Sequence, residues 1–123
     1  MNTAHVPAGW PEGVPPPGTP GWQHRATAWL LDLCPADYRG HPVLARQPLL
    51  LVYLAREHVR ASGAGLVRAR ASLRAELSGD VAPHVLDEAL AVLDDEEARL
   101  RAAFRGVEHL EAALRGHTFV PRL

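Results

Sequence analysis

Two long stretches of the chain repeat apolar residues at intervals of seven. The repeats are Val52, Val59, Leu66 and Leu73 in the first stretch and Leu86, Leu93, Leu100, Val107 and Leu114 in the second. Most of the positions three residues further on hold alanine or serine. This a/d spacing keeps one seam of a helix facing a partner helix in a left-handed coiled coil. We therefore expect two long helices, over about residues 48–77 and 81–115, that pack on each other.

The residues between the two stretches predict a tight reversal of the chain. Gly79 suits the left-handed conformation that often ends a helix, and Asp80 suits the cap of the next helix. Charge favours an antiparallel arrangement as well. Residues 56–74 carry five arginines and one acid, whereas residues 80–98 carry seven acids and no base. Folding the chain back at Gly79 places these two segments side by side, so that opposite charges face each other.

A shorter helix is expected over residues 22–33, where apolar residues recur with the spacing of one helix face. These residues are Trp22, Ala26, Trp29, Leu30 and Leu33. Residues 35–47 predict turns, with a short helical turn near residues 43–46. Residues 1–21 hold six of the eleven prolines and four of the ten glycines, a composition that resists helix and strand formation. They form either a flexible arm or an arm that tryptophans hold against the helices.

The predicted fold is a single all-α domain. A chain of 123 residues has room for one compact domain. We expect a long antiparallel helical hairpin with a coiled-coil-like seam, a shorter N-terminal helix packed near its open end, and a proline- and glycine-rich arm. The expected boundaries are residues 1–21 for the arm, 22–116 for the helical domain and 117–123 for the C-terminal tail.

Part of the hairpin should remain uncovered, because the helix over residues 22–33 is too short to reach along both long helices. Exposed apolar surface of this kind is typical of an interface with another protein or with a second copy of the chain. We assign candidate interaction residues to the uncovered part and to the arm. They are Leu90, Leu93, Glu96, Arg68, Arg70 and Trp10.

Glu96 stands out because it occupies a seam position. A carboxylate buried there is costly unless an arginine such as Arg60 or Arg70 pairs with it. Glu96 either fixes the register or oligomeric state of the seam, or lies open to solvent where Gly63 and Gly65 thin the packing. Each glycine costs about 1 kcal/mol relative to alanine inside a helix. The helix is therefore expected to kink there, to break, or to let another element approach closely.

The composition narrows the classes of function. A net charge of −1 and a pI near 6.6 argue against a dedicated nucleic-acid binder, which normally carries a basic excess. The single cysteine, Cys34, excludes an intramolecular disulfide and any zinc site with two cysteine ligands. The sequence shows neither a secretory signal nor an apolar run long enough to span a membrane. We expect a cytoplasmic protein.

Candidate catalytic chemistry is sparse. The seven histidines form no His-x-x-x-His pair and no His-Glu-x-x-His motif. Cys34, Asp37 and His41 share one turn-rich stretch and come nearest to a nucleophilic site. A free cysteine after an apolar helix is, however, usually a small buried hydrophobic side chain. We therefore expect no catalytic residue, no metal, no cofactor and no enzymatic activity.

Three segments resemble uncharacterised small helical proteins of high-GC actinobacteria. They are WLLDLCPADYR at residues 29–39, HPVL at residues 41–44 and RGHTFVPRL at residues 115–123. The resemblance implies a bacterial cytoplasmic setting. It carries over no activity, cofactor or site.

These features favour a non-catalytic helical scaffold or adaptor. It would act by self-association as a homo-oligomer or by docking a protein partner along the hairpin. The alternative is a regulatory nucleic-acid or small-ligand binder that uses the arginine-rich face of the helix over residues 48–77. Pairing of those arginines with the acidic segment of residues 80–98 weighs against the alternative.

Overall fold

The structure is a computed structural model that describes residues 5–120, and within these residues it is all-helical. The elements are α1 (Trp22–Leu33), the 3-10 helix η1 (Ala36–Gly40), α2 (Pro42–Arg46), α3 (Pro48–Leu77) and α4 (Pro83–Leu114). The all-α class is confirmed, and the ends of α1 and α3 match those expected from the sequence. The short helical turn near residues 43–46 is present as α2.

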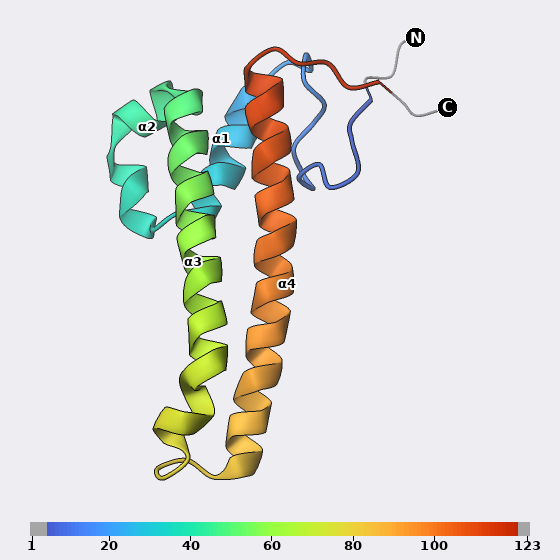
Figure 1. The fold of residues 1–123 in the computed structure, drawn as a ribbon. Helices are drawn as coiled ribbons and strands as arrows, with labels where there is room; N and C mark the ends of the chain where they lie inside the picture. Colours follow the sequence, from blue (N-terminus) through green and yellow to red (C-terminus); the bar gives the residue numbers. More distant parts are fainter. Residues whose placement is uncertain (1–4, 121–123) are drawn as a thin grey trace.

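The two long helices α3 and α4 lie side by side and run in opposite directions along the molecule (Figure 1). The reversal between them differs from the expected one. Gly79 is not left-handed, and Ala82 rather than Asp80 stands before α4, with no side-chain cap. Backbone hydrogen bonds make the turn instead, because the amides of Asp80 and Val81 both donate to the carbonyl of Leu77 at 2.9 Å. The helix then begins at Pro83, where the missing amide is tolerated.

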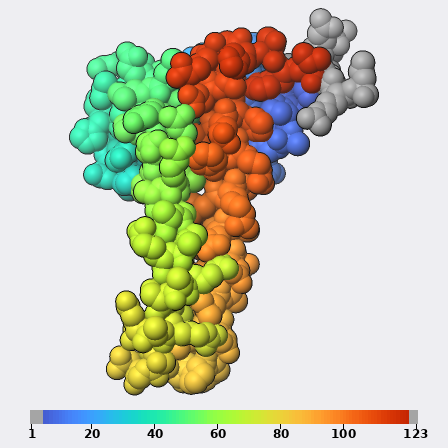
Figure 2. All heavy atoms as spheres, in the orientation of Figure 1, coloured from blue at the N-terminus to red at the C-terminus, as the bar shows by residue number. Residues whose placement is uncertain are grey.

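The molecule divides into a broad head and a narrow stalk (Figure 2). We define the stalk as residues 64–98, the second half of α3 and the first half of α4 with the turn between them. The head is the rest of the described chain. In the head, α1 packs across α3 and α4, while η1 and α2 pack beside α1 and α3 (Figure 1).

The hydrophobic core lies in the head. Its largest fully buried side chains are Leu30, Leu51, Leu110, Val52 and Val107. They come from α1, α3 and α4, so three layers of helix meet there. In the stalk only Leu86 is buried, because two helices in contact leave most of each circumference to solvent.

The N-terminal arm packs on the head, which is the second of the two expected alternatives for its described part. Val14 and Pro11 are buried, and the indole Nε1 of Trp10 donates to the Val14 carbonyl at 2.8 Å. The ring Nε2 of His109 lies 2.9 Å from the Ala8 carbonyl oxygen. The ring of Phe119 meets Trp10 edge-on, with centroids 5.7 Å apart. Backbone and aromatic contacts therefore tie the arm to α4 and to the C-terminal tail.

Candidate interaction groove

A groove opens between α3 and α4 where the head meets the stalk. Its volume is about 520 Å³. The floor is mostly apolar and consists of Val59, Gly63, Ala64, Val67, Leu100 and Phe104. The rim carries the charged residues Arg60, Arg101, Arg105 and Glu97. The groove thus combines apolar contact area with three guanidinium groups.

Gly63 keeps the groove open. Apart from the adjoining backbone of α3 itself, no described atom lies within 4 Å of the place that a Cβ would take at Gly63, and at Gly65 only the Arg68 guanidinium comes within that distance, at 3.9 Å. Helix α3 continues unbroken past both glycines, so the expected break is absent. No described element approaches either glycine closely. The helix therefore accepts two poor helix formers without any packing inside the chain that requires them.

The arginines of the rim differ in how they are held. The Arg60 guanidinium lies over the Phe104 ring, 5.7 Å from its centroid, and Arg60 Nη1 donates to Glu57 Oε1 at 3.3 Å. Arg101 is 3.9 Å from Glu97 and makes only a long ion pair. Arg105 has no ion-pair partner among residues 5–120. Positive charge is thus available to an incoming group on the α4 side of the groove.

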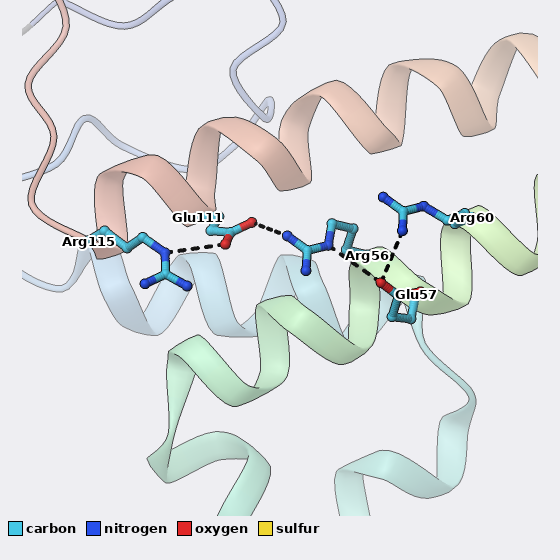
Figure 3. A network of polar contacts seen from close by, with 5 residues as sticks. All are labelled: Arg56, Glu57, Arg60, Glu111 and Arg115. Atoms are coloured by element: carbon cyan, nitrogen blue, oxygen red, sulfur yellow. Dashed lines mark hydrogen bonds and ion pairs between the residues drawn. The ribbon is translucent and has the colours of Figure 1, made fainter.

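In the head, a chain of ion pairs joins α3 to α4 (Figure 3). Arg56 Nη1 donates to Glu111 Oε1 at 2.6 Å and links α3 to α4, while Arg115 Nε donates to the other oxygen of Glu111 at 3.2 Å. The side chains of Arg56 and Glu111 are 24% and 21% exposed, which is less than in most of the other pairs. Arg56 Nε makes no hydrogen bond, although Glu57 Oε1 lies 3.7 Å away. Because its charges are partly shielded from water, this pair ties the two helices more firmly than an exposed pair does.

Along the stalk, arginines of α3 pair with acids of α4. Arg74 contacts Asp87, and Arg70 contacts both Asp94 and Glu97. The Glu97 side chain is 15% exposed, and its Oε1 lies 3.1 Å from Arg70 Nη2 without a well-aligned hydrogen bond. The opposite charges of the two segments are therefore in contact across the helix pair.

Of the two alternatives expected for Glu96, the structure shows the one in which this residue lies open to solvent rather than buried in the seam. Its side chain is 40% exposed, and Arg99, one turn further along α4, donates to its carboxylate at 2.5 Å and 3.1 Å. These hydrogen bonds lower the pKa of Glu96. Arg70 reaches the neighbouring Glu97 instead, and Arg60 pairs with Glu57. The carboxylate avoids the cost of burial by pairing with its own helix at the surface.

The structure separates the remaining candidate interaction residues. Leu90 and Leu93 are half-buried on α4 of the stalk, and Arg68 is exposed on α3 without an ion pair among the described residues. Trp10 lies apart from them, packed into the head. Four residues that line the groove were not predicted as interaction residues: Val67, Arg101, Phe104 and Arg105. Gly63 and Gly65 could have indicated them, because two glycines in one helix leave the facing helix without opposing side chains at that level.

The cysteine-centred alternative finds no support in the geometry. Burial raises the pKa of the Cys34 thiol, an effect that Arg39 partly offsets. Asp37 and His41 are exposed, and neither makes a side-chain hydrogen bond to Cys34 within the described chain. Residues 5–120 also contain no group of three His, Cys, Asp or Glu side chains placed to hold a metal ion. Cys34 therefore packs as an apolar side chain of the core.

None of the described helices is both long and apolar enough to span a membrane. The chain offers the groove, its arginines and the exposed surface of the stalk for binding. No model of a known protein family matches the sequence, and no curated protein or solved structure matches the chain.

Proposed function

We propose that this protein is a non-catalytic helical adaptor that docks a helical protein surface in the groove between α3 and α4. The observation that carries the proposal is the groove itself, about 520 Å³ of mostly apolar space beside a stalk that no third helix of residues 5–120 covers. Grooves of this shape accept the apolar face of an added helix. The coiled-coil-like hairpin, the cytoplasmic setting and self-association belong to the same proposal.

Exposed apolar residues along the stalk support a docking role. Val67 and Val92 are each 59% exposed, and Val85 and Leu77 are also exposed. A chain that needed α3 and α4 only to support its head would gain solubility from polar residues at these positions. Apolar side chains next to an apolar groove are typical of a surface that another protein covers.

The arginine-rich face of α3 supports the nucleic-acid alternative less well. Arg56, Arg70 and Arg74 are engaged by acids of α4, so their charges are already neutralised within the chain. The stalk carries three arginines and eight acids, a net charge of −5. A phosphate backbone would be repelled from this half of the molecule.

Photo-crosslinking in cells tests the proposal. A photoreactive phenylalanine analogue replaces Val67 in the groove or, as the control, Val43 on α2, which is 45% exposed and outside the groove. We expect protein adducts from position 67 that peptide mapping assigns to one surface, and no such adduct from position 43. Adducts with nucleic acid, or equal and scattered adducts from both positions, would contradict the proposal.

A further inference from the structure

We infer that the groove accepts a second copy of this chain, packed antiparallel about a two-fold axis beside Val67, so that two α3–α4 pairs form a four-helix bundle. The inference rests on the proposed docking function and names its occupant. It is carried by the order of side chains along α4 and by the distribution of charge over the helix pair.

One face of α4 is complementary to itself when reversed. Leu90, Asp94, Glu97, Arg101 and Phe104 follow one another at intervals of four, three, four and three, so they share this face. Reversal about Glu97 sets Leu90 against Phe104 and brings Asp94 within one residue of Arg101. In a parallel arrangement Arg101 would meet Arg101 and Asp94 would meet Asp94. Opposite charges and apolar pairs therefore coincide only in the antiparallel dimer.

The net charge of the helix pair gives the same orientation. The stalk has a net charge of −5, whereas residues 48–63 and 99–115 carry six arginines and three acids, a net charge of +3. An antiparallel second copy lays each acidic stalk along the basic part of the other molecule. A parallel copy places the two acidic stalks side by side.

The groove has room for the partner where the axis is placed. Val67 is 59% exposed at the stalk end of the groove, and Gly63, one turn away, leaves its floor open. Across the axis the two Val67 side chains would meet each other. The absence of a side chain at Gly63 would let the facing helix come closer than alanine allows. Glu97, which faces the same region, lies beside both Arg70 and Arg101, and these two guanidinium groups partly balance its charge.

A matched pair of variants tests the inference. Val67→Asp and Val92→Asp introduce the same charge at two valines of equal exposure, of which only Val67 lines the groove. Sedimentation velocity over a range of concentrations should show a dimer for the unaltered protein and for Val92→Asp. We expect Val67→Asp to raise the dimer Kd at least about tenfold, because two carboxylates would be desolvated at the axis. Circular dichroism shows whether each variant is folded.

The orientation is tested by a distance. Spin labels are attached at Ser78→Cys in a Cys34→Ala background, and the distance between the two labels of a dimer is measured. Ser78 is eleven residues from Val67, so the antiparallel dimer separates the labelled backbones by about 33 Å at 1.5 Å per residue. A separation near 30–40 Å supports the inference. Labels closer than about 20 Å would show a parallel dimer and overturn it.

Other results identify which proposal fails. A monomeric unaltered protein at high concentration overturns the second-copy inference, and so does a dimer that Val92→Asp dissociates while Val67→Asp does not. If such a monomer still forms adducts with one other protein from position 67, the docking function stands with a different occupant. If position 67 forms no adduct with any protein, both proposals fail.

Discussion

The head and the stalk contain the same heptad repeat, and they bury it to very different extents. In the head, Val52, Val59 and Val107 are almost fully buried. In the stalk, Leu66, Leu73 and Leu93 are only half-buried, and Leu86 next to the turn is the one buried member of the repeat. The difference arises because α1 and the arm add a third layer over the head, whereas the stalk has two helices alone. The heptad repeat specifies which faces of α3 and α4 meet. How deeply the seam residues are buried depends on which other elements cover the rest of the two helices.

The largest expected effect comes from truncating one leucine in each region. Leu110→Ala should lower the free energy of unfolding by about 3 kcal/mol, because Leu110 is fully buried among three layers. Leu93→Ala should lower it by about 1 kcal/mol, because that side chain is only partly buried. Urea unfolding followed by circular dichroism measures both values. Equal losses would show that the stalk is as well covered in solution as the head.

Removal of the arm should weaken the head and leave the stalk unchanged. Deletion of residues 1–21 removes the buried Val14 and Pro11 and uncovers part of α4. We expect a loss of about 2 kcal/mol and a Tm lower by about 8 °C. Thermal melting of the shortened protein measures the shift. An unchanged Tm would show that the arm contributes nothing to the fold and is available to a partner.

The glycines of the long helices sharpen the comparison further. A Cβ at Gly106 would lie 2.7 Å from the Trp29 ring, so Gly106→Ala should force α1 outward and cost about 1–2 kcal/mol. Gly63 faces open space, so Gly63→Ala should raise stability by about 0.5–1 kcal/mol through better helix propensity. Melting at low protein concentration isolates the single chain. A loss of stability in Gly63→Ala would reveal close packing at the groove that the single chain does not show.

The smallest effect is expected at Glu96. Because the Glu96–Arg99 pair is exposed, Glu96→Leu should leave the free energy of unfolding unchanged within the error of the measurement. The pKa of Glu96 is lowered in the folded state by the Arg99 hydrogen bonds. Its contribution is therefore present above the ordinary carboxyl pKa and disappears as the pH falls through the lowered value. A marked rise in Tm for Glu96→Leu near neutral pH would instead show that Glu96 is buried between the two long helices in solution.

Much of the fold could be predicted from local pattern. The spacing of Trp22, Trp29 and Leu33 and the proline at position 48 marked α1 and the start of α3, because helix periodicity and proline geometry act within a few residues. The reversal could not be predicted in detail. Gly79 permits a left-handed turn but does not require one, and the chain closed the turn through the Leu77 carbonyl instead.

The candidate site was predicted only in outline. The uncovered apolar surface was expected near the Gly79 turn, whereas the unusual glycines at 63 and 65 pointed to the middle of the long helices, where the groove opens. The heptad repeat singled out Glu96 but could not decide whether it is buried or open to solvent, because adjacent residues differ by about 100° around a helix and a heptad repeat leaves the exact facing direction open. Contact with Arg70 placed Glu97 toward α3 and left Glu96 outside.

By itself, the sequence determined the helices, the two apolar seams and the opposite charges that face each other across α3 and α4. These depend on periodicity, proline positions and composition, which act within a segment or between whole segments. The tertiary structure alone decided where the third layer ends, which acid meets which arginine, and that the groove opens at Gly63 beside Phe104. Those outcomes depend on side chains from distant segments competing for the same space, and no local pattern records the result of that competition.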